Sequence, residues 1–344
     1  MGNYDWLYSS LFPERGLIGN IITGIRLRPS MAKRRSAGKL QPAPLTLHFS
    51  LTSEVPEQYI DLSQCASIIN RRFYRQGLNW AVAGIKVIAS PGESGTITVS
   101  KLPATWMVSN SWEKCFRSWK RQQDEVLTEG RIESVRAAFN DFKIFADAEH
   151  QAMGVATNLV PVDHSVLRGE WDASKIVIPN YGAPGVNYEP NLHMVGTDTP
   201  GVGGSIGMVK AYQNSRGVPQ SPDPTVPGPV LSTDNFLNLM FDVGDDNTDV
   251  LDNVVDENNE LPYVQIEYPG GDAQASDLQI HDMCAISAST SLASTSSITG
   301  GAFPCGLIKF QTVVSGVGVF EPTLLLQLVP GPNRGYLTQP MTDM

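Results

Sequence analysis

Short segments in which apolar and polar residues alternate recur along most of this chain. In the first, LTLHFSL at residues 45–51, Leu47 and Phe49 lie on one face, and Thr46 and His48 on the other. Because successive side chains of a strand point to opposite faces, this pattern predicts a half-buried β-strand. Further candidates, many of them bounded by Gly, Pro, Asn or Asp, are residues 79–88, 96–102, 142–147, 175–178, 206–212, 236–241, 263–268, 278–287, 307–314 and 323–329. So many short strands predict an all-β fold of antiparallel sheets, either a sandwich or a barrel.

Helical periodicity is confined to the first half of the chain. One helix is predicted from a cap at Asp61 or Ser63 through Arg72, a second starts near Asn110, and a third spans residues 131–139. The apolar positions expected to face inward are Cys65, Ile68, Ile69 and Phe73 in the first, Trp112, Cys115, Phe116 and Trp119 in the second, and Ile132, Val135 and Phe139 in the third. The sheets are therefore expected to carry a few helical insertions.

A basic N-terminal arm, residues 1–42, is predicted to precede a β domain, residues 43–344. Between residues 15 and 39 the arm has seven cations and no acid, and little sustained apolar periodicity, so we expect it to be at least partly extended. These cations are Arg15, Arg26, Arg28, Lys33, Arg34, Arg35 and Lys39. The stretch MAKRRSAGK also matches a short, weakly specific nuclear import pattern. Within the β domain, proline-rich residues 180–234 and acidic residues 242–260 are predicted to form long surface loops.

Charge is distributed unevenly between the two halves of the chain. Residues 1–170 hold 20 of the 25 Lys and Arg and 16 of the 35 Asp and Glu, a balance of +4, whereas residues 171–344 have a balance of -14. This asymmetry favours one basic and one acidic face, as in a protein with a polyanion on one side; two differently charged surfaces without such a partner are the alternative. No run of eighteen apolar residues occurs, so membrane insertion is not expected.

Cations and aromatic residues are concentrated in INRRFYRQGLNW, residues 69–80. We expect a helix ending near Arg72, a turn at residues 76–77 and a strand starting by Trp80. Clustered cations of this kind neutralise phosphates without reading sequence, and nearby rings stack on unpaired bases. The candidate nucleic-acid-binding residues are Arg71, Arg72, Arg75, Lys114, Arg117, Lys120 and Arg121, with Arg26, Arg28, Lys33, Arg34, Arg35 and Lys39 of the arm. The alternatives are that the rings are core residues and that the arginines contact acids of a neighbouring subunit.

No catalytic site is predicted. The glycine-rich GVGGSIG, residues 201–207, lacks the adjacent lysine–serine pair of a phosphate-binding loop. Cys284 follows His281 by three residues, so on a strand the two side chains would point to opposite faces and could not act together. The four cysteines, Cys65, Cys115, Cys284 and Cys305, have no metal-ligand spacing, and we expect them to be reduced and mostly buried.

The acidic residues 242–252 raise the question of a calcium site, because calcium takes several carboxylate oxygens. The stretch lacks the ligand spacing and central glycine of an EF-hand loop, which favours a solvated loop. Calcium bridging two subunits is the alternative, and no resident cofactor is otherwise expected.

Several blocks of this sequence resemble one known family. YIDLSQCASIINRRFYRQGLNWAVAGIKV, TITVSKLPATWMVSNSWEKCFRSWKRQ, LQIHDMCAIS, GGAFPCGLIKF and LVPGPNRGYLTQPMTDM are similar to capsid proteins of circular, replication-initiator-encoding single-stranded DNA (CRESS-DNA) viruses. The resemblance extends in blocks from about residue 59 to residue 344, and RRFYRQG and RGYLTQPM are its most specific parts.

The resemblance implies a single jelly-roll sandwich of two antiparallel sheets that assembles with copies of itself into an icosahedral shell around a single-stranded DNA genome. It implies a location in the virion, with the host nucleus as a compartment during assembly. It does not identify the host receptor. Members of this family usually carry a longer, arginine-rich arm. Two alternatives from other classes are a carbohydrate-binding or hydrolytic jelly-roll protein and a viral spike without nucleic-acid contact.

Overall fold

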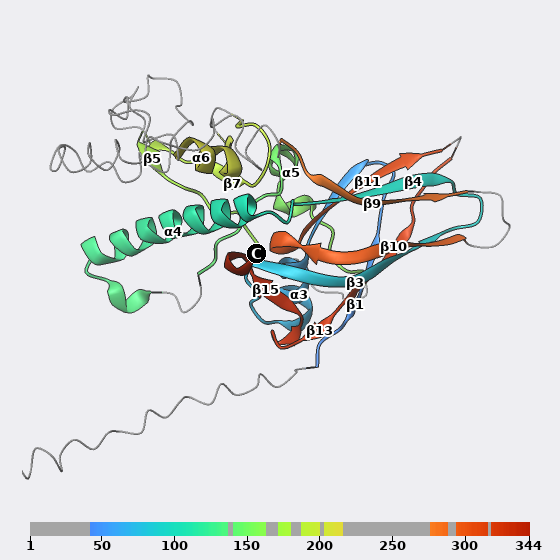
Figure 1. Cartoon of the computed structure of the whole chain (residues 1–344), viewed down its shortest axis with the longest axis horizontal. Helices are drawn as coiled ribbons and strands as arrows, with labels where there is room; N and C mark the ends of the chain where they lie inside the picture. The colour runs from blue at the N-terminus through green and yellow to red at the C-terminus, as the bar shows by residue number, and fades with distance from the viewer. Residues whose placement is uncertain are drawn as a thin grey trace, which may run out of the picture.

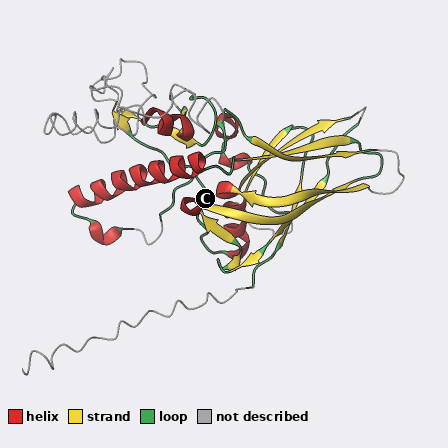
Figure 2. Ribbon diagram, in the orientation of Figure 1, coloured by secondary structure: helices red, strands yellow, loops and turns green. Residues whose placement is uncertain are grey.

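Two antiparallel sheets packed face to face form the body of the molecule, as expected for an all-β sandwich (Figures 1 and 2). The computed structural model describes residues 42–136, 140–162, 171–179, 187–199, 203–215, 276–287, 294–315 and 318–344. The first sheet has the order β1 (Thr46–Ser50), β12 (Thr323–Leu328), β3 (Leu78–Ala89) and β10 (Ser294–Phe303), and β15 (Thr338–Pro340) also pairs with β3. The second has the order β2 (Glu57–Asp61), β11 (Leu307–Val314), β4 (Gly95–Lys101) and β9 (Gln279–Ile286).

Alternation within the strands creates the core between the two sheets. Leu47 and Phe49 of β1 and Leu324 and Leu326 of β12 are almost fully buried, while the residues between them are more exposed. The second sheet contributes inward side chains in the same way, including Ile97, Val99, Ile308 and Phe310. Burying one face of each sheet fixes the strand register, because a shift by one residue would turn every apolar side chain outward.

The helices gather at one end of the sandwich (Figure 1). Short connections, residues 51–56 and 90–94, join β1 to β2 and β3 to β4 at the other end. At the helical end, α3 (Leu62–Asn70) lies between β2 and β3, and the long interval between β4 and β9 contains α4 (Trp106–Glu129), α5 (Ala148–Met153) and α6 (Met208–Ser215). None of the described helices is long and apolar enough to span a membrane.

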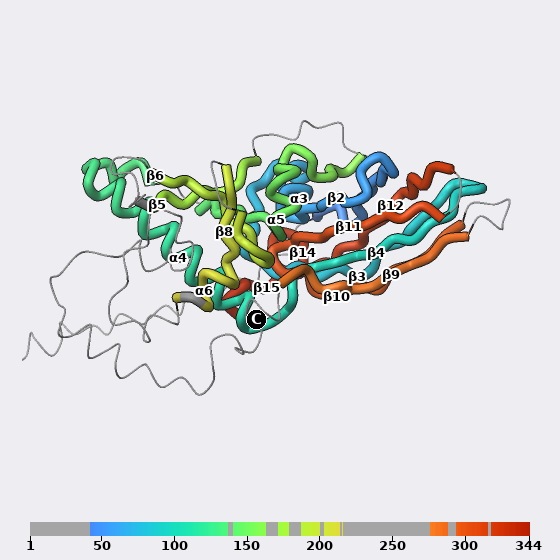
Figure 3. Tube along the Cα trace, turned by 90° about the horizontal axis from the view of Figure 1, so that it is seen from above, coloured from blue at the N-terminus to red at the C-terminus, as the bar shows by residue number. Residues whose placement is uncertain are grey.

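A second apolar core lies beside the sandwich, between α4 and a group of short elements (Figure 3). These elements are β5 (Ile178–Pro179), β6 (Asn187–Tyr188), β7 (Asn191–His193), β8 (Ser205–Gly207) and α6. Met107, Trp112 and Cys115 of α4 face this core, together with Phe142 and Leu192. The outer face of the second sheet forms one of its walls, because Tyr59 and Leu307 also belong to it.

The structure confirms several expected elements and corrects others. The strands expected at 45–51, 79–88, 96–102, 278–287, 307–314 and 323–329 are present as β1, β3, β4, β9, β11 and β12. The 206–212 strand is wrong beyond Gly207, where α6 begins, so helices are not restricted to the first half. Residues 142–147 and 175–178 contribute only isolated bridges at Phe145 and Lys175, apart from Ile178 at the start of β5. Residues 236–241 and 263–268 lie outside the described residues.

The first two helix predictions were right in place but not in extent. Asp61 caps α3 through hydrogen bonds from the backbone of Ser63 and Gln64, and Thr105 caps α4, which therefore starts four residues before Asn110. The third helix is wrong, because only a 3₁₀ turn, Glu133–Val135, is present in its described part. Ile132 and Val135, expected inward, are 46% and 65% exposed, because the turn does not pack on either core.

The expectation of surface loops at residues 180–234 is also corrected where that range is described. Leu192, Ile206 and Met208 are fully buried, and the short strands and α6 that carry them pack against α4. The prolines that suggested a loop fall mainly in residues 216–234, which lie outside the described residues, as do residues 242–260.

Candidate nucleic-acid interface

The RRFYRQG segment forms the junction between α3 and β3. The helix ends at Asn70, and Arg71 adopts a left-handed conformation with φ 50°, which ends the helix two positions before the predicted residue. Arg71, Arg72 and Arg75 are all exposed, whereas Gln76 is buried. The three arginines therefore lie on the surface of a junction, as predicted, and β3 begins two residues before Trp80.

Buried hydrogen bonds fix this junction from below. Asp61 accepts from the backbone N–H groups of Ser63 (2.8 Å) and Gln64 (3.2 Å), and from Nε2 of Gln76 and Nε1 of Trp171, each at 3.1 Å. Burial raises the pKa of the Asp61 carboxyl to about 6, against the lowering effect of these donors. The side chain of Gln76 also pairs with both backbone groups of Ile144, at 2.6 and 3.0 Å. The side chain of Gln76 thus holds the residue next to Arg75 against the start of α3 and against Ile144 of the second core.

Tight packing restricts the same segment. Gly77 lies against the indole of Trp112 from α4, and a Cβ at this position would overlap the ring. Glycine is therefore required here by close approach between the junction and the helix. Tyr74 is buried beside Trp80 and Tyr336, with ring centroids 6.0 and 5.6 Å away, whereas Phe73, expected inward, is only half buried.

A C-terminal segment completes a pocket next to the junction. It comes from the hairpin of β13 (Pro330–Gly331) and β14 (Gly335–Tyr336). Nη1 of Arg334 donates to the backbone oxygen of Phe73 at 2.7 Å, and the Tyr74 hydroxyl donates to the backbone oxygen of Arg334 at 3.0 Å. The pocket has a volume of about 300 Å³ and is lined by Phe73, Tyr74, Arg75, Leu78, Asn140, Asn333 and Arg334. We call it the Arg75–Arg334 pocket; none of these described lining residues carries a carboxylate.

The chain enters the described fold close to this pocket. The hydroxyl of Tyr336 donates to the backbone oxygen of Pro44 at 2.9 Å and accepts from Asn70 at the end of α3 at 2.9 Å. The basic arm therefore joins the domain on the side where Arg71, Arg72 and Arg75 lie. Its predicted binding residues Arg26, Arg28, Lys33, Arg34, Arg35 and Lys39 are outside the described residues.

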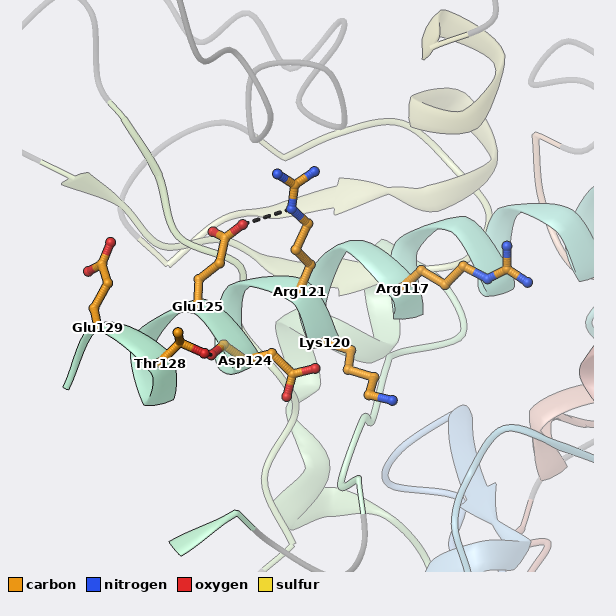
Figure 4. A pocket seen from close by; sticks show the side chains of 7 residues that line it. All are labelled: Arg117, Lys120, Arg121, Asp124, Glu125, Thr128 and Glu129. Atoms are coloured by element: carbon orange, nitrogen blue, oxygen red, sulfur yellow. Dashed lines mark hydrogen bonds and ion pairs between the residues drawn. The ribbon is translucent and has the colours of Figure 1, made fainter. Parts of the chain in front are cut away.

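The four cations of α4 form a separate group, and three of them already have partners. Figure 4 shows one of these pairs, Arg121 with Glu125. Arg117 pairs with Glu113 at 2.5 Å and Arg121 with Glu125 at 2.7 Å, although both arginines are more than half exposed. Lys114 donates to the hydroxyl of Ser215 at 2.6 Å and lies over the ring of Tyr212. Only Lys120 of the four makes no ion pair or hydrogen bond within the described part of the chain.

A shallow groove runs along this face of α4. Its lining is mixed in charge: Arg117, Lys120, Arg121, Asp124, Glu125, Thr128 and Glu129. Figure 4 shows the cations toward the start of the helix and the carboxylates toward its end. Compared with the Arg75–Arg334 pocket, this groove therefore offers an anion a weaker field.

Arg334 is the member of the site that the strand and helix patterns missed. It lies 261 positions from Phe73, and no periodicity or spacing connects the two. The available signal was the sequence resemblance, in which RRFYRQG and RGYLTQPM are the most specific blocks; the structure brings these two blocks into contact.

Two further groups of polar side chains each contain a histidine. Nδ1 of His193 lies 2.9 Å from the hydroxyl of Ser205, but both residues are fully buried, and burial lowers the pKa of His193. Cys284 is buried and His281 bonds the backbone oxygen of Thr299, so these two do not form a pair. The four cysteines are free and buried, which confirms that prediction.

Among the described residues, no group of three or more His, Cys, Asp or Glu is arranged to hold a metal ion. Three carboxylates, Glu57, Asp147 and Glu149, do converge, but on the ammonium group of Lys309, at 3.2, 3.5 and 2.5 Å. The calcium question concerns residues 242–252, which lie outside the described residues.

Comparison with known protein families, curated proteins and solved structures gives no match to this chain.

Proposed function

We propose that this chain is a capsid protein of the CRESS-DNA virus type, which assembles with copies of itself into an icosahedral shell and packages circular single-stranded DNA. The strand order carries the proposal. Numbered one to eight along the chain, β1 to β4 and β9 to β12 form sheets of order 1-8-3-6 and 2-7-4-5. Two Greek keys wound into a jelly roll produce such an order, and viral capsid subunits are one class that uses it.

Lectin domains and cupins share this architecture, so the fold alone does not select a function. Exposed apolar side chains favour self-association. Ile280, Met283 and Val313 are 66%, 62% and 54% exposed. They lie on strands β9 and β11 of the second sheet, where Met283 pairs with Thr98 and Val313 with Thr96. Neighbouring exposed apolar residues on one sheet are typical of a surface that another copy covers.

Charge supports the packaging part of the proposal. Residues 15–39 of the arm have seven cations and no acid, and the arm joins the domain beside three exposed arginines at the α3–β3 junction. These groups would neutralise phosphates of the genome without reading its sequence. In this arrangement the basic first half contributes more of the shell's interior and the acidic second half more of its exterior.

Size-exclusion chromatography and electron microscopy of the purified full-length chain test the proposal. We expect particles of many tens of subunits that carry nucleic acid, seen as a raised ratio of absorbance at about 260 nm to that at about 280 nm. A monomer or trimer at every salt concentration contradicts shell assembly. Shells without nucleic acid would contradict the packaging part alone.

A further inference from the structure

We propose that the Arg75–Arg334 pocket binds one nucleotide of single-stranded nucleic acid, with a phosphate on Arg75 and the base against Phe73. The inference rests on the proposed function only in taking the packaged genome as the source of that nucleotide. The pocket itself is defined by described residues of the α3–β3 junction and the β13–β14 hairpin.

The charge of the pocket selects an anion. Among the described residues, its lining contains two guanidinium groups and no carboxylate. Arg75 is exposed and makes no ion pair or hydrogen bond with another residue of the described chain. The other basic surface differs, because Asp124, Glu125 and Glu129 line the α4 groove beside its cations. An anion therefore gains more at Arg75, where no acid competes for the guanidinium.

The opposite wall is already in a fixed conformation. Arg334 has a left-handed backbone, φ 51°, and its Nη1 bonds the backbone oxygen of Phe73. Its guanidinium carbon lies 6.0 Å from the ring centroid of Tyr74, whose hydroxyl bonds back to Arg334. A guanidinium has five N–H donors in a rigid fork, and the bond to Phe73 fixes the orientation of that fork. Because the side chain is held before binding, little conformational entropy remains to be lost.

The remaining lining suits a base rather than a simple anion. Phe73 is half buried and Leu78 buried, which gives the pocket an apolar side. Asn140 and Asn333 add amide groups; the Nδ2 of Asn333 donates to Thr338 at 2.8 Å, which fixes its orientation. Base stacking on an aromatic ring tolerates every base, as packaging requires. A volume of about 300 Å³ is at the small end of ligand sites and suits one nucleotide unit.

An acidic segment of a neighbouring subunit would also pair with the arginines, but it would make no use of the aromatic side of the pocket.

A binding experiment distinguishes a nucleotide from an acidic segment as the occupant of the pocket. Full-length protein is titrated into a fluorescein-labelled oligothymidylate, and anisotropy is followed over a series of sodium chloride concentrations. Particle formation is measured separately by electron microscopy.

Two substitutions address the two halves of the nucleotide. Arg75→Gln should lower the slope of log affinity against log salt by about 0.7, the value for one phosphate contact to a single strand. Phe73→Leu should weaken binding by about 5- to 100-fold, as expected for loss of one stacked base, and leave the slope unchanged. Arg131→Gln is the matched control: Arg131 is exposed, beyond the end of α4, and should change neither quantity.

The outcomes distinguish this inference from shell assembly. Oligonucleotide binding unchanged in both Arg75→Gln and Phe73→Leu overturns the pocket, whether or not shells form. Loss of shells in Arg75→Gln with unchanged oligonucleotide binding also overturns it, and indicates an acidic neighbour. If the variants lose oligonucleotide binding and the parent protein never forms shells, the result supports the pocket and counts against the capsid proposal.

The thermal unfolding midpoint is the control for folding. Because Arg75 is exposed, the Arg75→Gln variant should keep the midpoint of the parent.

Discussion

At the scale of single residues, His150 shows how the fold fixes a protonation state. Its Nδ1 accepts a hydrogen bond from the backbone N–H of Ala146 at 3.1 Å, and its Nε2 lies 2.8 Å from Oδ1 of Asn158. The ring stacks on Tyr59 with centroids 4.3 Å apart. An acceptor at Nδ1 and a donor at Nε2 require the neutral imidazole, and burial lowers its pKa to about 4.

This histidine should make stability depend on pH. The unfolded side chain takes up a proton near pH 6.5 and the folded one only near pH 4, so its contribution is fully present above pH 6.5 and is lost as pH falls through the folded pKa. As pH falls from 6.5 to about 4, the difference in free energy of unfolding between the parent and His150→Gln should shrink by up to about 1.4 kcal/mol per pH unit. Urea unfolding at several pH values measures it. A difference that stays constant with pH would show that His150 does not carry the effect.

The residues of the candidate site were predictable to different degrees. Exposure of Arg71, Arg72 and Arg75 followed from local rules, because a helix that ends before a turn leaves polar side chains at the surface. The packing of Gly77 under Trp112 and the bond from Arg334 to Phe73 did not follow, since both depend on tertiary contacts. Local patterns report which side chains are outside; they do not report which of them meet.

At the scale of elements, α4 changes character along its length. Its buried residues end at Ser118, and from there to Glu129 every side chain is partly or fully exposed. The helix therefore extends beyond the second core, with Val126 64% exposed. In its outer half Arg121 pairs with Glu125 four residues on, and Asp124 pairs with Arg136 beyond the end of the helix. Charge on this half belongs to pairs rather than to one continuous basic surface.

This pairing predicts unequal contributions from neighbouring cations. Lys120→Gln should lower the salt slope of oligothymidylate binding by about 0.7, because that ammonium has no carboxylate partner in the described chain. Arg121→Gln should lower it by less, since Glu125 already balances its charge. Anisotropy titrations over several salt concentrations compare the two variants. An unchanged slope in Lys120→Gln would remove α4 from the DNA-facing surface.

Elements were predictable where their sequence pattern was unambiguous. The ends of β11 agree with the predicted strand, whereas β10, STSSITGGAF, was not predicted because its serines, threonines and glycines give no clear alternation of apolar and polar residues. It is a strand because it pairs along β3 from Ala89 to Trp80, and Gly300 is needed where the backbone of Ala83 comes close. In α6, a short apolar run was compatible with strand or helix, and packing against α4 decided the outcome.

At the scale of the whole molecule, the two cores share their walls. Neighbouring residues of β2, Tyr59 and Ile60, belong to the second and the first core, and Leu307 and Ile308 of β11 divide in the same way. If β2 or β11 moves away from one core, its contacts with the other core are disturbed as well. We therefore expect the sandwich and the α4 region to unfold together.

Two buried cysteines allow this to be measured. Cys65 lies in the first core and Cys115 in the second, and burial raises the pKa of both thiols, that of Cys115 to about 12. Neither should react with a brief pulse of an alkylating reagent in the native protein. In a urea series, labelling quantified by mass spectrometry should rise at the same midpoint for both cysteines. Two separated midpoints would mean that the cores open independently.

The interleaved strand order also has a consequence for synthesis of the chain on the ribosome. Within the described sheets, β1 to β4 make no hydrogen-bonded pair with one another; their neighbours are β9, β10, β11, β12 and β15. A nascent chain that has not yet reached residue 279 therefore has four unpaired apolar strands and no sheet to place them in. Folding of the sandwich must wait for the last fifth of translation, and until then the emerging polypeptide depends on chaperones or on low local concentration to avoid aggregation.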